Sequence, residues 1–210
     1  MRTGQTNDPH RLTFRAFGAV TLFALLYATL VTGAVPASAQ PHRIQCELEL
    51  WAKKTLRDKG ANAINFVARD TTIAWLIGQG APADPDTVVR RIAPVEISSW
   101  RISAQLVGYR IEADGDYHLV LRDPRGRTMI GEVPAPYCVT SRSDQYQQLR
   151  ASVDRLGHHH ATRQWWWLDY RGKKPPTITV SGIGFFDRIH RTDGQAPNGV
   201  ELHPVLRIAP

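Results

Sequence analysis

The 210-residue sequence contains none of the short motifs that identify several large classes of enzyme. It has neither the HExxH motif of zinc metallopeptidases nor a G-x-S-x-G nucleophile elbow, so a Ser-His-Asp hydrolase has no positive support. It also lacks a phosphate-binding glycine loop, because Gly182-Ile183-Gly184 has no third glycine and stands inside an alternating apolar run. These glycines instead predict close backbone packing in a strand. No internal repeat is visible.

Long runs of like charge are also missing. The chain carries 26 lysines and arginines against 19 acidic residues, a formal net charge of +7. Its basic residues are scattered, and no basic run is longer than Arg90-Arg91 or Lys173-Lys174. A positive balance favours anionic partners such as nucleic acid, cell-wall polymers or lipid headgroups, but the scatter makes this a weak indication.

Charge is absent from Ala16–Val35, an apolar stretch that follows a segment with three arginines in residues 2–15. The small residues Ala37-Ser38-Ala39 come next, where signal peptidase requires small side chains. The pattern predicts a signal peptide over residues 1–39, cleaved after Ala39, and a secreted or periplasmic protein without a stable membrane span after cleavage. An uncleaved anchor is the alternative, since about 20 apolar residues can span a bilayer.

Cysteine is scarce, with Cys46 and Cys138 alone in the chain. Export places both in an oxidising compartment, where a pair is most simply a disulfide. The alternative is a catalytic thiol with a histidine partner, which would leave a second, reactive cysteine in that compartment. We therefore expect a disulfide that closes a long loop and stabilises the fold by about 4 kcal/mol in the chain-entropy model.

The middle of the chain predicts a meander of three strands. Apolar and polar residues alternate over Trp100–Glu112, which is the period of a half-buried strand. Asp114-Gly115-Asp116 then supplies a turn, and Tyr117–Leu121 predicts the second strand. A further turn at Asp123–Gly126 leads to a third strand over Thr128–Val133.

The rest of the chain adds a helix and two strands. Ser143–Leu156 has apolar residues at helical spacing, and Gly157 is expected to end that helix. Strands are predicted over Thr177–Phe186 and Val200–Ile208. Three strands, a helix and two more strands are the element order of the five-stranded OB barrel, so the predicted fold class is mainly β and OB-like. Another small open barrel or an α+β sheet is the alternative.

The segment before the barrel is rich in glycine, alanine, aspartate and proline. Its one apolar patch, Thr71–Leu76, predicts a short helix or turn, and Ala81–Asp86 predicts a loop. We therefore expect residues 40–95 to form an irregular wrapping segment, and residues 96–210 to form the OB-like barrel with it as one globular unit.

Several stretches carry a recognisable pattern: Cys46–Leu56, Arg91–Glu96, Asp114–Leu121, Gly182–Asp187 and Ala196–Leu206. On these stretches the chain resembles a family of uncharacterised exported bacterial proteins. The resemblance covers most of the predicted mature chain. The resemblance implies the domain boundaries given above and no mechanism. Gly157–Lys174, with its three histidines and three tryptophans, departs from the family pattern.

Two pairs of polar residues suggest a metal site. Asp116 and His118 stand two residues apart on a predicted strand and so share a face, and Glu201 and His203 do the same. If the two strands are neighbours, two carboxylates and two imidazoles converge, which suits a divalent cation. We expect no cofactor, with a divalent metal ion as the alternative.

The same polar group allows a catalytic and a structural interpretation. Asp187 and His190 could orient a water for metal-assisted hydrolysis. In the structural interpretation Asp114, Asp116 and Asn198 shape turns. Asp187 then caps a strand end, and His203 satisfies a buried backbone group. The sequence favours the structural interpretation, because spacing alone does not define a metal site.

A second candidate site combines aromatic and basic side chains. The candidate binding residues are Trp165, Trp166, Trp167, Tyr170, Arg171 and Lys173. Three consecutive histidines, His158–His160, precede them in the sequence. OB surfaces use aromatics interleaved with cations to stack bases or sugars while contacting phosphates. The alternative is that the tryptophans are partly buried in a loop or contact a membrane interface.

Together these features favour a binding module over an enzyme. We expect an exported OB-like module that binds an anionic polymer, a nucleic acid or a glycan at or beyond the cell envelope. The alternatives are a metal-dependent hydrolase, such as a phosphodiesterase or nuclease, and a structural or protein-interaction domain. The sequence makes no prediction of oligomeric state.

Overall fold

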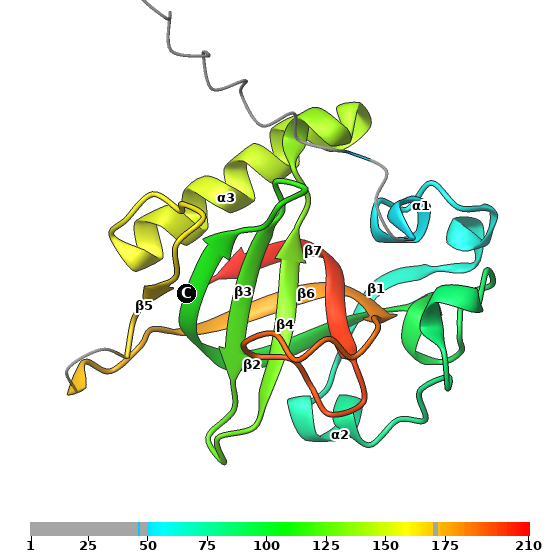
Figure 1. Cartoon of the computed structure of the whole chain (residues 1–210), viewed down its shortest axis with the longest axis horizontal. Coiled ribbons are helices and arrows are strands. Elements are labelled where there is room, and N and C mark those ends of the chain that lie inside the picture. The colour runs from blue at the N-terminus through cyan, green and yellow to red at the C-terminus, as the bar shows by residue number, and fades with distance from the viewer. Residues whose placement is uncertain (1–45, 47–49, 170–171) are drawn as a thin grey trace, which may run out of the picture. The chain divides into compact units, whose positions relative to one another are not determined.

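A computed structural model describes Cys46, residues 50–169 and residues 172–210 of the chain (Figure 1). The export signal predicted for residues 1–39 lies outside the described residues. Within the described ranges, the helices are all too short or too polar to cross a membrane.

The centre of the fold is a closed barrel of five strands (Figure 1). The strands are β2 (Ser98–Ile111), β3 (Tyr117–Arg122), β4 (Thr128–Val133), β6 (Thr177–Phe186) and β7 (Val200–Ala209). Around the barrel the order is β2, β3, β4, β7, β6 and back to β2. The β4–β7 pair is parallel and the other pairs are antiparallel, which is OB topology and confirms the predicted fold class.

Closure depends on the length of β2, which pairs with two neighbours in succession. Its first part pairs with β6 from Ser99 to Gln105, and its second part pairs with β3 from Gln105 to Ile111. A register shift between Leu106 and Gly108 separates the two parts. Such a bulge bends a strand and increases its twist, and so lets β2 turn from one neighbour to the other.

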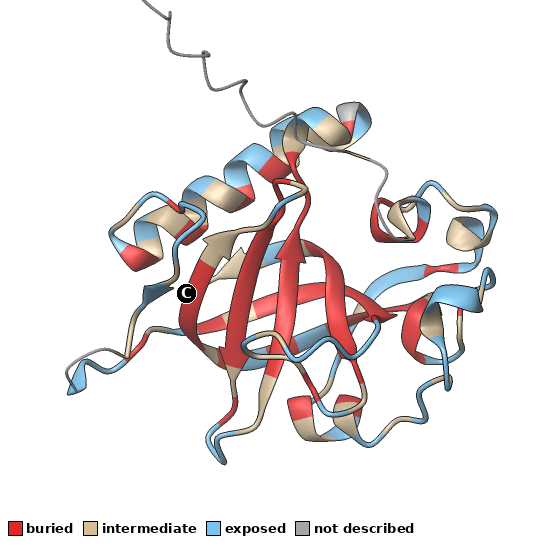
Figure 2. Cartoon of the chain, viewed as in Figure 1, coloured by how far each residue is buried: buried red, intermediate tan, exposed pale blue. Residues whose placement is uncertain are grey.

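The barrel interior and helix α3 (Ser143–Gly157) form one apolar core (Figure 2). Tyr146, Leu149 and Val153 recur at helical spacing and are all buried in that core. The helix follows β4 and precedes β6, as the sequence predicts. Its left-handed C-cap residue is His158, with φ of 51°, and Gly157 is the last helical residue.

The remaining elements surround the barrel. They are α1 (Trp51–Lys54), η1 (Lys59–Ala63), β1 (Asn65–Asp70), α2 (Ile73–Ile77), η2 (Pro85–Thr87), η3 (Val95–Ile97), η4 (Pro136–Cys138), η5 (Thr140–Arg142) and β5 (Trp166–Trp167). The predicted short helix is α2, but β1 was not expected. It pairs in parallel with β2 from the outside of the barrel, and most of its residues are exposed.

The predicted disulfide is present. Cys46 and Cys138 are joined with an S–S distance of 2.02 Å and a Cα–Cα distance of 5.5 Å, and no free cysteine remains. The bond connects the start of the described N-terminal segment to η4, between β4 and α3. It fits an oxidising, extracytoplasmic location.

Candidate functional site: an acidic cavity on the barrel

Polar side chains collect on the outer face of β3, β4 and β7. Alternate residues of a strand point to opposite faces, and the inward set includes Leu119, Val133 and Leu202 of the core. His118, Glu132, Glu201 and His203 occupy the other positions and therefore face outward. His118 pairs with Glu132 across the β3–β4 ladder. All four side chains are nevertheless buried.

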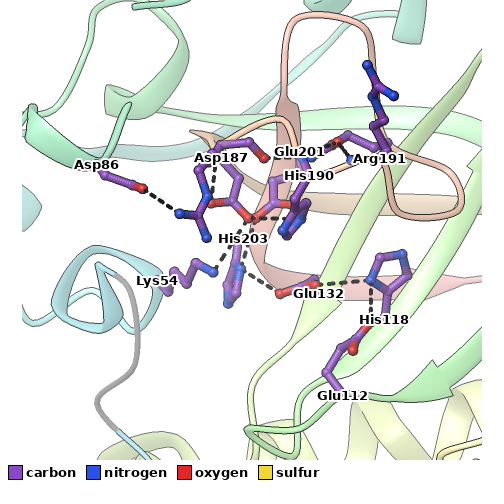
Figure 3. Close-up of polar contacts among 12 residues, drawn as sticks. Lys54, Asp86, Glu112, His118, Glu132, Asp187, His190, Arg191, Glu201 and His203 are labelled. Atoms are coloured by element: carbon purple, nitrogen blue, oxygen red, sulfur yellow. Dashed lines mark hydrogen bonds and ion pairs between the residues drawn. The ribbon is translucent and has the colours of Figure 1, made fainter. Parts of the chain in front are cut away.

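Glu132 connects the two histidines of this group (Figure 3). Its Oε1 lies 3.2 Å from Nδ1 of His118, and its Oε2 lies 3.0 Å from Nδ1 of His203. Burial alone would raise the pKa of Glu132, but the charge of His203 and the hydrogen bonds from both histidines lower it well below its usual value. Glu132 is thus an ionised carboxylate in a buried position.

His203 lies among three carboxylates and is fully buried. Besides Glu132, its Nδ1 lies 3.1 Å from Oε1 of Glu201, and its Nε2 lies 3.3 Å from Oδ2 of Asp116. Burial alone would lower the pKa of His203, but Glu132 and the other carboxylates raise it well above its usual value. The structure therefore brings three of the four predicted metal-site residues into contact. Among the described residues, the polar partners of His203 are carboxylates, whereas the structural interpretation predicts a backbone partner.

His118 is on the other side of Glu132, away from this contact group. Its Nδ1 lies 3.0 Å from Oε1 of Glu112, and its Nε2 lies 2.9 Å from the carbonyl oxygen of Asp193. Both ring nitrogens therefore have protein partners. Burial alone would lower the pKa of His118, but hydrogen bonds to Glu112 and Glu132 raise it to about 10. The geometry gives His118 a structural rather than a metal-ligating role.

A cavity of about 320 Å³ opens beside these residues. Carboxylates dominate its charged lining, and they are Glu112, Asp114, Glu132, Asp187 and Glu201. The opposing charges and imidazoles come from Lys54, Arg110, His118 and His190. The predicted catalytic pair lines the same cavity as two of the predicted metal-site residues, His118 and Glu201, with His190 Nε2 3.9 Å from Asp187 Oδ2.

Lys54 reaches this cavity from α1. Its Nζ lies 3.7 Å from Oδ2 of Asp187, and only about a tenth of its side chain is exposed. Burial alone would lower the pKa of Lys54, but the charges of Glu132, Asp187 and Glu201 raise it far above its usual value. The lysine is therefore a fixed positive charge that offsets part of the acidic lining.

Crowding of carboxylates raises two further pKa values. Burial and the neighbouring Glu132 raise the pKa of Glu201 to about 7. Burial and the neighbouring Asp116 raise the pKa of Asp114 to about 6. Carboxylates in a cleft whose pKa is raised by burial and by like charge are typical of functional sites.

The tryptophan segment lines a different and larger cavity, of about 800 Å³. Trp165, Trp166, Trp167, Lys173 and Lys174 are among its lining residues. Tyr170 and Arg171, also predicted for this site, lie outside the described residues.

The tryptophan rings already stack within the protein. Trp165 and Trp167 are stacked with centroids 4.7 Å apart, and Trp166 stacks on His159 at 3.9 Å. Trp166 and Trp167 stay about 40 % exposed. One face of each stacked ring is thus covered, so the rings offer edges and single faces to a partner.

Neither a family model nor a curated protein matches this chain. The resemblance on its five sequence stretches therefore remains a prediction. Of the two cavities, the acidic one has the more specific chemistry because it joins residues from α1, β2, β3, β4, β7 and two loops.

Proposed function

We propose that the chain is an exported OB-like binding module whose ligand occupies the acidic cavity, and that the group bound there is a cation. The observation that carries this proposal is the set of five carboxylates around one cavity of about 320 Å³. OB folds bind ligands on this barrel face, between the loop after the first barrel strand and the loop between the last two. Here these loops contribute Asp114 and Asp187.

The sign of the charge decides the class of ligand at this place. An anionic polymer would meet like charge in a partly buried site, where charges are screened less than at the surface. Burial and then neighbouring carboxylates raise the pKa of Glu201 and Asp114, and an ammonium or guanidinium group would relieve the second of these effects. The anionic or carbohydrate ligand expected from the sequence fits the cavity lined by Trp166, Trp167 and Lys173 better.

The test measures binding of charged probes to the mature protein. Calorimetric titrations would use spermidine and a lysine-rich peptide as cations, and single-stranded DNA and heparin as anions. We expect the cations to bind with an affinity that falls as salt rises. Glu112→Gln and Asp187→Asn should weaken that binding, and Asp144→Asn, on an exposed residue of α3 outside the cavity, should leave it unchanged.

The outcomes separate the two cavities. Cation binding that survives Glu112→Gln and Asp187→Asn would contradict the proposal. Binding of DNA or heparin alone, lost in Trp166→Ala, would move the ligand site to the tryptophan cavity.

Metal-assisted hydrolysis is the second candidate function. The observation that favours it is that Asp187 and His190, the pair predicted to orient a water, line the same cavity as Glu132 and Glu201. A phosphodiester substrate such as bis-p-nitrophenyl phosphate, assayed with Mn²⁺ and with a chelator, tests it. Turnover that the chelator and His190→Gln both abolish would favour an enzyme, and binding without turnover would favour the module.

A further inference from the structure

We propose that Asp116, Glu132 and His203 form a binding site for one divalent transition-metal ion, of the class of Zn²⁺ or Mn²⁺. One donor atom from each residue lies within 4.8 Å of the other two. Three ligands about 2.1 Å from a common ion lie roughly 3–4.2 Å from one another. Asp116 Oδ2 and His203 Nε2 are already 3.3 Å apart. Glu132 Oε2 lies 3.0 Å from the other ring nitrogen, Nδ1, so this carboxylate has to turn towards Nε2 to complete the site.

The environment of the Nε2 atom of His203 points most directly to a metal ligand. The side chain is fully buried, and among the described residues its Nε2 makes no hydrogen bond, although the Asp116 carboxylate lies close to it. A buried polar atom without a hydrogen bond is costly, and the Asp116 contact at 3.3 Å satisfies Nε2 only electrostatically. A metal ion between Nε2 and Asp116 would supply that partner.

The other nitrogen of His203 is held as metal-bound histidines usually are. Its Nδ1 hydrogen-bonds Oε1 of Glu201 at 3.1 Å. A carboxylate that accepts the second N–H of a histidine fixes the ring and directs the free nitrogen at the metal. Glu201 is therefore a positioning residue. The sequence predicts it as a metal ligand only because it shares a strand face with His203.

Asp116 is also oriented by its surroundings. Its Oδ1 accepts a hydrogen bond of 2.8 Å from the backbone N–H of Ala135. The remaining oxygen, Oδ2, faces His203. One oxygen is thus used to fix the carboxylate, and the other is directed at the proposed ion.

The donor set selects the class of ion. One imidazole with two carboxylates suits Zn²⁺ or Mn²⁺, which accept nitrogen and oxygen together. Calcium prefers six to eight oxygens, more than this buried group offers. The ion would also place positive charge beside the carboxylates of Asp116, Glu132 and Glu201, all of which contact His203.

This inference goes beyond the proposed function, because the organic cations that test the cavity need no metal. The protein can therefore bind spermidine without binding a metal ion, or bind a metal ion without binding spermidine. The two results are read from different variants, since Glu112 and Asp187 are not in the proposed ligand set.

The experiment titrates Zn²⁺ and Mn²⁺ into chelator-treated mature protein by calorimetry, with Ca²⁺ and Mg²⁺ for comparison, and measures bound metal by mass spectrometry. We expect about one Zn²⁺ or Mn²⁺ per chain. Asp116→Asn keeps the side-chain shape and the Ala135 contact, and should bind at least about tenfold more weakly. Asp144→Asn removes an exposed carboxylate of α3 that lines neither the cavity nor the proposed site, and should bind as the unmodified protein does.

X-ray absorption of the zinc-bound, unmodified protein gives a readout that needs no variant to fold. We expect one imidazole and otherwise oxygen ligands around the zinc. Two or more imidazoles would place the ion elsewhere, for example at His158–His160, and overturn the proposal. Absence of stoichiometric Zn²⁺ or Mn²⁺ binding would also overturn it, as would unchanged affinity in Asp116→Asn.

Discussion

The Oε2 atom of Glu132 lies 3.0 Å from Nδ1 of His203, and this ion pair joins β4 to β7 on the outer face of the barrel. The β4–β7 ladder is short, with Ile130 opposite Glu201 and Gly131 opposite Leu202. Glu132 and His203 occupy the next position along it. The pair therefore fastens the barrel where backbone pairing is least extensive, and its carboxylate, Glu132, also lines the acidic cavity.

Replacing Glu132 with glutamine should destabilise the protein strongly. Glutamine keeps the shape, but it removes the carboxylate that His118 and His203 share, and leaves both buried imidazoles without their common counter-charge. Breaking a buried ion pair by removing one partner typically costs about 3 kcal/mol or more. Urea unfolding at pH 7 measures the loss.

Glu112→Gln is the matched control for that change. Glu112 also contacts His118, but about a quarter of its side chain is exposed. Its removal should cost less than about 1 kcal/mol, as for partly exposed ion pairs. Equal losses in the two variants would show that burial at Glu132 does not set the energy of this network.

The sequence predicts most of the fold because the barrel strands combine alternation with clear turns. The bounds of β4 and β6 agree with the predicted ones, since turn residues or a loop end each strand. The strand β1 carries no such signal. Its residues are exposed on both faces, and it is a strand only because the edge of β2 pairs with it.

The candidate site was predicted in part. Asp116, Glu201 and His203 follow from side chains that share a face, but their meeting depends on the parallel β4–β7 pairing, which is not visible in local patterns. Glu132 was missed although it stands in a predicted strand. The register of the β3–β4 hairpin places it opposite His118, and a tight turn fixes that register, so this signal could have identified it.

Removing the disulfide should lower the free energy of unfolding substantially. The bond closes a loop between residues 92 positions apart, so it restricts the unfolded chain strongly. Replacing both Cys46 and Cys138 with serine should cost about 4 kcal/mol in the chain-entropy model. Denaturant unfolding of the double variant measures the loss, and the unmodified protein under reducing conditions should show a similar one. Two free thiols in the unreduced protein would contradict this prediction.

Asp123 should make the β3–β4 turn sensitive to acid. Burial alone would raise its pKa, but the hydrogen bond from the Arg127 side chain and those from the backbone N–H groups of Arg127 and Arg125 lower it. A carboxyl with a lowered pKa stabilises the fold above its unfolded value of about 3.8, and this contribution is lost as pH falls through the folded value.

The comparison of Asp123→Asn with the unmodified protein isolates this contribution. The variant should be the less stable of the two at pH 6, and the difference should shrink as the pH falls from about 5 towards 2. Thermal unfolding across that range gives the difference directly. A difference that stays constant with pH would mean that the ionised form of Asp123 has no special partners in the turn.

Gly157 should tolerate no side chain. A Cβ atom there would overlap the ring and hydroxyl group of Tyr109, which is fully buried and donates a hydrogen bond of 2.7 Å to the carbonyl oxygen of His159. Gly157→Ala therefore has to displace Tyr109, and overpacking of this kind costs about 1–3 kcal/mol.

Gly80→Ala is the control, because a Cβ atom at Gly80 meets no atom within 4 Å, and its effect should stay within about 0.5 kcal/mol. Since the Trp166 indole donates to the carbonyl oxygen of Gly157, the displacement should also change the tryptophan fluorescence of the folded protein. A variant with unchanged stability and fluorescence would mean that α3 does not pack against β2 as closely as described.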